Sequence, residues 1–179
     1  MKNLEFKILK KQNISNSLFE EFFKILENSF LKEEFRSFEK QKDLLEKDAY
    51  NILFCFENES VIAIMAFWHL ENFTFIEHFA VKEQFRKQGI GSKMMKFLLS
   101  KYKNIVILEV ELPYNEVNVK RIEFYKKLGF CYNDFEYFQA PLNKGDKPLP
   151  LRIMSYPKNI SKSEFNNMKS KLIKSVYKD

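Results

Sequence analysis

Two glycines spaced one apart, after an apolar stretch, are the residues most suggestive of chemistry. They are Gly89 and Gly91, in the stretch from Phe79 to Leu99 that reads FAVKEQFRKQGIGSKMMKFLL. Where a strand leads through a glycine turn into a helix, unpaired backbone N–H groups and the positive end of the helix dipole converge. The turn is therefore a candidate phosphate site, or else a structural helix start that holds no ligand.

The familiar phosphate loops do not match this turn. A P-loop requires G-x-x-x-x-G-K-[ST], but Gln84 stands where its first glycine would be and Ile90 follows Gly89. A Rossmann fingerprint requires a third glycine where this chain has Met94. Spacing alone therefore leaves both interpretations open.

The elements that must hold this turn follow from the hydrophobic pattern. Alternating residues predict strands, and apolar residues three and four apart predict helices, the first capped by Ser15 or Ser17. The predicted strands are Leu4–Leu9, Asn51–Phe56, Val61–His69, Asn72–Val81, Ile105–Leu112, Phe130–Phe138 and Leu149–Tyr156. The predicted helices begin at Ser15 and Ser161 and also cover Glu34–Lys47, Ile90–Tyr102 and Val117–Leu128.

This order predicts an α/β fold with a mixed, mostly antiparallel sheet of about seven strands flanked by helices. The strand, helix, strand sequence around the glycine turn implies a right-handed crossover, which makes the fourth and fifth strands parallel. With 179 residues, 45% of them hydrophobic, we expect one domain over 1–179, with 158–179 as a C-terminal helical extension.

Composition excludes some classes of protein. The longest apolar run, Val61 to Trp68, is far shorter than the ~20 residues that span a bilayer, so no membrane segment is expected. Cys55 and Cys131 lie far apart with no signal-peptide pattern before them, which favours a reduced, cytoplasmic setting. With His69 and His78 they match no zinc spacing, so no metal site is expected. Richness in Lys, Asn, Ile and Phe is compatible with an AT-rich bacterial genome.

Two motifs together resemble a known family. RKQGIG, from Arg86 to Gly91, resembles the Q/R-x-x-G-x-G/A signature in motif A of the GNAT (Gcn5-related N-acetyltransferase) superfamily. NVKRIEFYKKLGF, from Asn118 to Phe130, is similar to its motif B, N-x-x-A-x-x-L-Y-x-x-x-G-F. With the order of elements, the resemblance covers about residues 1–156. It implies the GNAT fold and acetyl-CoA as the acyl donor.

The resemblance also implies roles for individual residues. The thioester and pantetheine would bond to the main chain of the preceding strand, Asn118 would bond the pantetheine arm, and Tyr125 would be the general acid that protonates the departing thiolate. Tyr125 could instead be a core aromatic. Arg121 departs from the alanine usual in the family and either brings a cation near the phosphates or faces solvent. The other implied donor-site residues are Phe79, Ala80, Val81, Arg86, Lys87, Gln88, Gly89, Ile90, Gly91 and Ser92.

The general base is open among three carboxylates. An acceptor ammonium must lose a proton before its nitrogen attacks, and a carboxylate provides the route. Glu77 is the first candidate, since a regular strand would project Glu77 and Phe79 to the same face. Glu109 and Glu111 share one face of the next strand and are the alternatives. Each could also be an ordinary surface carboxylate, and His78 is expected to be structural.

These observations predict an N-acetyltransferase that moves an acetyl group from acetyl-CoA to a primary amine by direct attack in a ternary complex. Cys131 is not placed as a covalent nucleophile. A non-catalytic acyl-CoA-binding or regulatory domain on the same fold is the alternative. The lysine-rich tail, from Lys158 to Lys178, raises nucleic-acid binding, but no recognition motif accompanies it. The expected partner is a small-molecule or peptide amine, with no membrane and no nucleic acid; a homodimer is compatible with the sequence. The acceptor itself is not specified.

Overall fold

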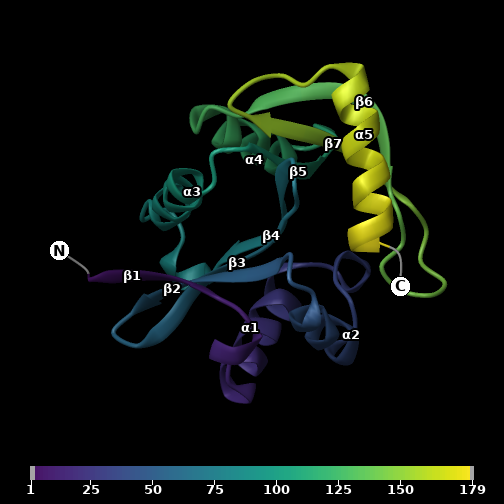
Figure 1. The fold of residues 1–179 in the computed structure, drawn as a ribbon. Helices are drawn as coiled ribbons and strands as arrows, with labels where there is room; N and C mark the ends of the chain where they lie inside the picture. Colours follow the sequence, from purple (N-terminus) through teal and green to yellow (C-terminus); the bar gives the residue numbers. More distant parts are fainter. Residues whose placement is uncertain (1–2, 178–179) are drawn as a thin grey trace.

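The computed structural model describes residues 3–177, which build one seven-stranded sheet in the order β1-β2-β3-β4-β5-β7-β6 (Figure 1). The strands are β1 (Leu4–Leu9), β2 (Tyr50–Glu57), β3 (Ser60–His69), β4 (Phe73–Val81), β5 (Ile105–Glu111), β6 (Cys131–Gln139) and β7 (Leu149–Tyr156). The helices are α1 (Asn16–Ser29), α2 (Phe38–Asp43), α3 (Ile90–Lys101), α4 (Glu116–Lys127) and α5 (Lys162–Leu172).

The parallel pair that the sequence predicts at the fourth and fifth strands is confirmed. β4 and β5 pair in parallel from Phe73 with Ile105 to Ile76 with Leu108, whereas every other neighbouring pair in the sheet is antiparallel. The two strands continue beyond this short register without pairing to each other. Their unpaired ends form a V-shaped opening in the sheet, which we call the splay.

A hydrophobic core lies on each face of the sheet. One core joins α1, α2 and α5 to the sheet and holds many of the phenylalanines, among them Phe19, Phe22 and Phe54. The other joins α3 and α4, with Met94 and Leu98 fully buried. Burial of this apolar surface, at roughly 25 cal/mol per Å², is the main force that fixes the helices on their faces. The splay therefore lies in a sheet that is covered by a packed core on each face.

A β-bulge in β4 corrects one sequence-based expectation. Ala66 pairs with His78 and Phe67 with Ile76, so Glu77 is an extra residue with no partner on β3. A bulge breaks the alternation of side chains along a strand. Glu77 therefore projects into the core of α1 and α2, whereas Phe79 packs in the core of α4. The expectation that Glu77 and Phe79 share a face is wrong.

The segment predicted as one helix from Glu34 to Lys47 is interrupted. A 3-10 turn ends at Glu34, Phe35 is extended with φ −144° and ψ 160°, and α2 covers only six residues before a second 3-10 turn. The extended stretch places Arg36 in the interior, 4% exposed, against Glu77. Its ion pair there explains why helical periodicity fails locally.

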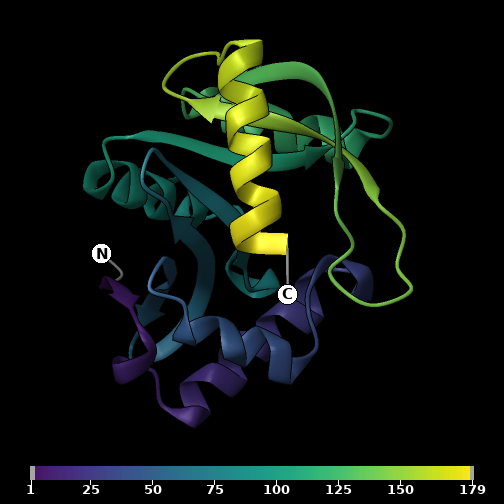
Figure 2. The same ribbon diagram turned by 45° about the vertical axis from the view of Figure 1, so that its right-hand side comes forward.

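The C-terminal segment folds back over the sheet. The predicted capping box is confirmed, since Ser161 Oγ accepts from Glu164 N at 3.2 Å and Ser161 N donates to Glu164 Oε2 at 2.7 Å. α5 crosses the sheet with its C-terminal end toward the α1–α2 region (Figure 2), and a π-helical turn from Ile173 to Tyr177 follows it. Lys178, counted in the basic tail, lies outside the described residues. Within residues 3–177, no helix has the length and apolar character needed to cross a bilayer.

Candidate active site

The splay brings together the carboxylates of the two central strands. Glu77 and Glu109 are the first residues after the last parallel pair, Ile76 with Leu108. A cavity of about 300 Å³ opens beside them, which we call the splay cavity. Its lining includes Phe30, Glu77, Phe79, Glu109, Arg121 and Tyr125.

The free edge of β4 faces this cavity. In an antiparallel pair, successive residues direct their backbone N–H and C=O groups to alternate sides. Lys82 N donates to Ile62 O of β3 at 2.9 Å, so by alternation Ala80 also faces β3. Phe79 and Val81 therefore point their backbone groups into the splay, where an extended ligand could bond to them.

A second cavity, of about 520 Å³, lies at the start of α3 and is called the loop cavity. Gly89 caps the helix with φ +74°, a left-handed conformation that glycine adopts without strain. The first helical hydrogen bond at this end runs from Lys93 N to Gly89 O at 3.1 Å. The N–H groups from Ile90 to Ser92 therefore have no intrahelical acceptor and can bind an anion.

Gly91 has a different reason to be glycine. A Cβ at this position would lie 3.4 Å from the ring carbons of both Phe124 and Phe79. A Cβ there would only touch the two rings, so the absent side chain mainly keeps the cavity open beside the first turn of α3.

The side chains of Arg86, Lys87 and Gln88, in the turn before α3, have different surroundings. Arg86 Nε donates to Val81 O at 3.0 Å, so this arginine folds back onto the end of β4 and lines both cavities. Lys87, with φ +61°, lines the loop cavity, whereas Gln88 Nε2 donates to Gln84 O at 3.1 Å. Arg86 and Lys87 thus bring two positive charges to the loop cavity.

Tyr125 is the residue that joins the two cavities. It is 8% exposed, packs against Phe124 and Phe130, and lines both the splay cavity and the loop cavity. Among the described residues its hydroxyl has no hydrogen-bond partner. Burial raises the pKa of Tyr125 to about 12, although the positive charge of Arg121 acts to lower it. The phenol therefore keeps its proton at neutral pH and can donate it.

Two residues of α4 make contacts that the sequence did not predict. Arg121 forms an ion pair with Glu111 at the end of β5 and lines both cavities, which is more than a solvent-facing position. Asn118 Nδ2 donates to Leu112 O at 2.9 Å, so its amide braces the connection from β5 to α4. Its oxygen remains available for the pantetheine arm, and that role stays a prediction.

Glu77 is engaged in a buried ion pair. Its Oε1 accepts from Arg36 Nη1 at 2.6 Å and its Oε2 from Trp68 Nε1 at 3.0 Å, with the Glu77 side chain 1% exposed. Burial alone would raise the pKa of this carboxyl, but the Arg36 charge, helped by His78, outweighs burial and holds the pKa below its usual value. Buried His78 contacts Glu34 O through Nε2 at 2.8 Å, as a structural residue does.

Glu109 has the opposite electrostatic character. Burial raises its pKa to about 7, even though three hydrogen bonds favour the charged form. Oε1 accepts from the hydroxyls of Tyr137 at 2.5 Å and Tyr177 at 2.7 Å, and Oε2 accepts from Gln139 Nε2 at 3.0 Å. No cation within the described residues bonds to it.

These partners of the two carboxylates were not singled out from the sequence. Tyr137 and Gln139 are two apart on one strand, so the sequence could show that they share a face. It could not show that Glu109 lies opposite them. Arg36 lies between Phe35 and Phe38, but the charged residues Glu34 and Glu39 are almost as close in the chain, so the sequence does not mark it as buried. Nothing in the local pattern links Tyr177 to a strand 68 positions earlier in the chain.

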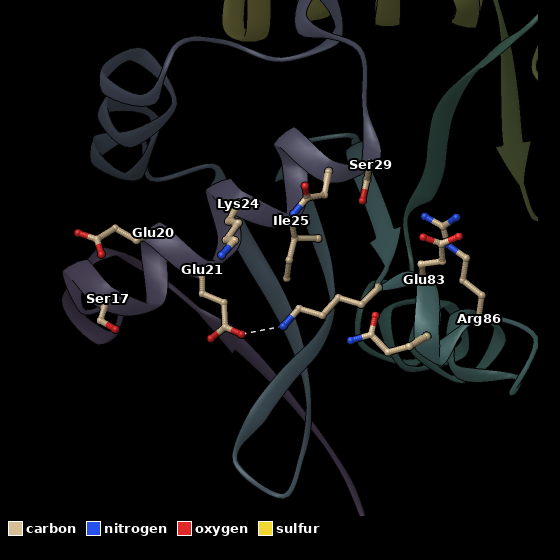
Figure 3. A pocket seen from close by; sticks show the side chains of 11 residues that line it. Ser17, Glu20, Glu21, Lys24, Ile25, Ser29, Glu83 and Arg86 are labelled. Atoms are coloured by element: carbon tan, nitrogen blue, oxygen red, sulfur yellow. Dashed lines mark hydrogen bonds and ion pairs between the residues drawn. The ribbon is translucent and has the colours of Figure 1, made fainter.

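A third cavity, of about 690 Å³, adjoins the site between α1 and the β4–α3 connection (Figure 3). It shares Ser29 and Arg86 with the splay cavity. Lys82 Nζ pairs with Glu21 Oε1 across it at 2.8 Å, and Glu20, Lys24 and Glu83 add charges of both signs. This approach to the splay is therefore polar without a strong net charge.

Comparison with known proteins defines the class. The sequence matches the profile of the Acetyltransferase (GNAT) family over residues 14–130. A Bacteroides thetaiotaomicron structure assigned to the GNAT acetyltransferases superposes with a TM-score of 0.88 at 26% identity, covering 97% of this chain and 98% of that one. The chain therefore belongs to the GNAT acetyltransferase family, whose acyl donor is acetyl-CoA.

More distant structures share the fold. The Escherichia coli ribosomal-protein-S18-alanine N-acetyltransferase has a TM-score of 0.62 at 16% identity, covering 88% of this chain and 96% of that one. An Elizabethkingia anophelis GNAT acetyltransferase with acetyl-CoA bound has a TM-score of 0.59 at 16% identity, covering 86% and 97%. No curated protein matches the sequence significantly.

Proposed function

We propose that this protein is an N-acetyltransferase that moves the acetyl group of acetyl-CoA to a primary amine by direct attack in a ternary complex. The observation that carries the proposal is the junction of two cavities at Tyr125. The loop cavity offers helix N–H groups and cations suited to a pyrophosphate, and the splay cavity offers carboxylates suited to an ammonium. A thioester lying between them would meet its acceptor in the splay.

The donor is held mainly by the backbone. The N–H groups at the start of α3 bond the pyrophosphate, with Arg86 and Lys87 beside it, and glycine at 89 and 91 lets the phosphate approach. The pantetheine lies along the free edge of β4. The N–H of Phe79 or Val81 polarises the thioester carbonyl and stabilises the negative charge that develops on its oxygen.

Tyr125 acts as the general acid. Its side chain lines both cavities, and its raised pKa keeps the proton on the phenol until the C–S bond breaks. Donation to the sulfur then releases coenzyme A as a thiol. Arg121 lies close enough to oppose the effect of burial on this phenol and so favours proton release.

The acceptor enters the splay from the face covered by α1, α2 and α5, opposite to α3 and α4. The charges around this approach are mixed, which fits a small-molecule or peptide amine better than a long polycation. The base is one of the carboxylates of the splay. Glu77 stays a prediction in that role, and its ion pair with Arg36 argues for a structural contribution instead.

The test is acetyl-CoA-dependent release of thiol over a panel of amines. The panel holds polyamines, amino acids, aminoglycosides and peptides with free N-termini or lysines, and mass spectrometry identifies the acetylated product. We expect thiol release with at least one amine, matched by an equal amount of N-acetyl product. Binding of acetyl-CoA without thiol release for any amine would overturn the proposal and favour a non-catalytic acyl-CoA-binding domain.

A further inference from the structure

We infer that Glu109 takes the proton from the acceptor ammonium, and that Tyr177 of the C-terminal segment holds the Glu109 carboxylate in position to do so. The inference rests on the proposed function and identifies a proton acceptor and a positioning residue within it. It gives the C-terminal segment a part in catalysis.

The hydrogen bonds of Glu109 leave one position open. An ionised carboxylate accepts about four hydrogen bonds. Two tyrosine hydroxyls bond to Oε1, from Tyr137 at 2.5 Å and Tyr177 at 2.7 Å, and Gln139 Nε2 bonds to Oε2 at 3.0 Å. Because Glu109 also lines the splay cavity, the remaining position on Oε2 is the one that an ammonium can use.

The other two carboxylates are each paired with a guanidinium. Both oxygens of Glu77 are bonded, one to the buried guanidinium of Arg36, and its side chain is 1% exposed. Glu111 forms an ion pair with Arg121. The Arg36 guanidinium holds the pKa of Glu77 below its usual value despite burial, which makes Glu77 a poor proton acceptor.

The electrostatic surroundings of Glu109 suit a base at neutral pH. Tyr137 and Gln139 face it from β6, Tyr177 faces it from the C-terminal segment, and the charge of Glu77 reaches it from β4. Burial raises the pKa of Glu109 to about 7, and Glu77 adds to this, whereas the three hydrogen bonds oppose it. A base works best when its pKa lies near the operating pH.

The C-terminal segment contacts both Glu109 and the ion pair of Glu77. Tyr177 bonds to Glu109 directly, and Val176 O accepts from Arg36 Nη2 at 2.6 Å, behind Glu77. The ring of Tyr177 also packs against Phe75 of β4, with centroids 6.4 Å apart. The segment thus ties β4 and β5 together where their own pairing has ended.

The proton balance of the step is simple. The ammonium gives one proton to the Glu109 carboxylate, which becomes a carboxylic acid, and the freed lone pair attacks the thioester carbon. The C–N bond forms as the carbonyl π electrons move to oxygen, and the C–S bond then breaks as the oxyanion collapses. Tyr125 protonates the sulfur and regains a proton from the acylated nitrogen, while Glu109 returns its proton to water.

The test compares Glu109→Gln and Tyr177→Phe with two matched controls on β6. Glu136→Gln changes an exposed carboxylate, and Tyr132→Phe removes a half-buried hydroxyl outside the cavities. The first measurement is the pH profile of kcat/KM for the fastest amine of the panel. The second is an NMR titration of the ¹³C-labelled Glu109 carboxyl in the wild type and in Tyr177→Phe.

We expect Glu109→Gln to lower kcat/KM roughly 10²–10⁴-fold. Its pH profile should also lack the limb near pH 7 that reports the titration of Glu109. Tyr177→Phe should lower kcat/KM less than Glu109→Gln does. It should shift the pH-profile limb and the NMR midpoint upward by roughly 0.5–1 pH unit, since one hydrogen bond to the charged form is lost. Turnover with an unchanged limb in both variants, or a Glu109 midpoint below pH 5, would overturn this inference alone. No turnover by the wild type would overturn the proposed function as well.

Discussion

At the residue scale, our proposal has the hydroxyl of Tyr125 donate a proton from within a packed core. Replacing Tyr125 with Phe keeps the contacts with Phe124 and Phe130 and removes only the acid. We expect kcat to fall roughly 10²–10⁴-fold with acetyl-CoA binding unchanged, measured by steady-state kinetics and calorimetry. Tyr132→Phe serves as the control. Full activity in Tyr125→Phe would show that the leaving thiolate needs no protein acid.

The two motif glycines should respond differently to alanine. Gly89 has φ +74° with nothing within 4 Å of the place that a Cβ would take, so Gly89→Ala meets only backbone strain and should cost about 1–2 kcal/mol of stability. Gly91 has helical backbone, and its Cβ would make ordinary contacts at 3.4 Å, so Gly91→Ala should be nearly neutral. Denaturant unfolding measures both, and equal losses would contradict this distinction.

Sequence reasoning at this scale yields more predictions for the donor side than for the acceptor side. Gly89, Gly91 and Tyr125 were singled out because local motifs specify a turn and a helix face. The electrostatic difference between Glu77 and Glu109 was not accessible, because it depends on Arg36 and Tyr177, which approach from other elements. Charge pairing across a fold is a tertiary property that strand periodicity does not encode.

At the scale of elements, the bulge in β4 decides what Glu77 does. It turns Glu77 toward Arg36, and removing one partner of a buried ion pair leaves the other charge uncompensated. Glu77→Gln should therefore destabilise the fold by about 3–5 kcal/mol in chemical unfolding. Glu21→Gln, which breaks the more exposed pair with Lys82, should cost less than about 1 kcal/mol. Equal costs would argue against a structural role for Glu77.

The capping box of α5 offers a test of the C-terminal segment. Ser161→Ala removes the side chain that accepts from Glu164 N, and should lower stability by about 1 kcal/mol in thermal or chemical unfolding. Exposed Ser170→Ala lies within the same helix and lacks a capping role, so it should change stability little. A loss in Ser170→Ala as large as that in Ser161→Ala would show that the cap contributes nothing special.

The order of elements and the parallel pair were predictable from periodicity and turn residues, because both are local signals. The bulge and the broken helix after Glu34 were not. Both serve to bury Arg36 against Glu77, a contact between positions 41 apart in the chain. A tertiary contact of this kind can impose a backbone conformation that differs from the one that local helix or strand propensity favours.

At the scale of the whole molecule, Glu109 links the site to the pH dependence of stability. Its folded pKa of about 7 lies above the ordinary glutamate pKa of 4.5, so between these values the folded protein binds more protons than the unfolded chain. The contribution of this carboxyl is complete below about pH 4.5 and is lost as the pH rises toward 7. Glu109→Gln should therefore gain stability relative to the wild type on going from pH 4.5 to 8, by up to ~3 kcal/mol. A pH-independent difference in chemical unfolding would contradict the raised pKa.

The sheet also separates the two substrates. α3 and α4 on one face hold the donor in our proposal, and α1, α2 and α5 on the other face surround the acceptor, so the substrates meet only at the splay (Figure 1). Such an arrangement favours transfer while both are bound. In this proposal no covalent acetyl-enzyme intermediate forms. Cys131 is half-buried on β6 and does not line the splay cavity.

The most direct measurement of the central claim is the initial rate of thiol release as acetyl-CoA and the best amine of the panel are varied together. Direct transfer in a ternary complex predicts double-reciprocal lines that intersect, with N-acetyl product formed in step with thiol. Parallel lines, with thiol released from acetyl-CoA before any amine is added, would reveal an acetylated enzyme. That result would contradict direct attack at the splay.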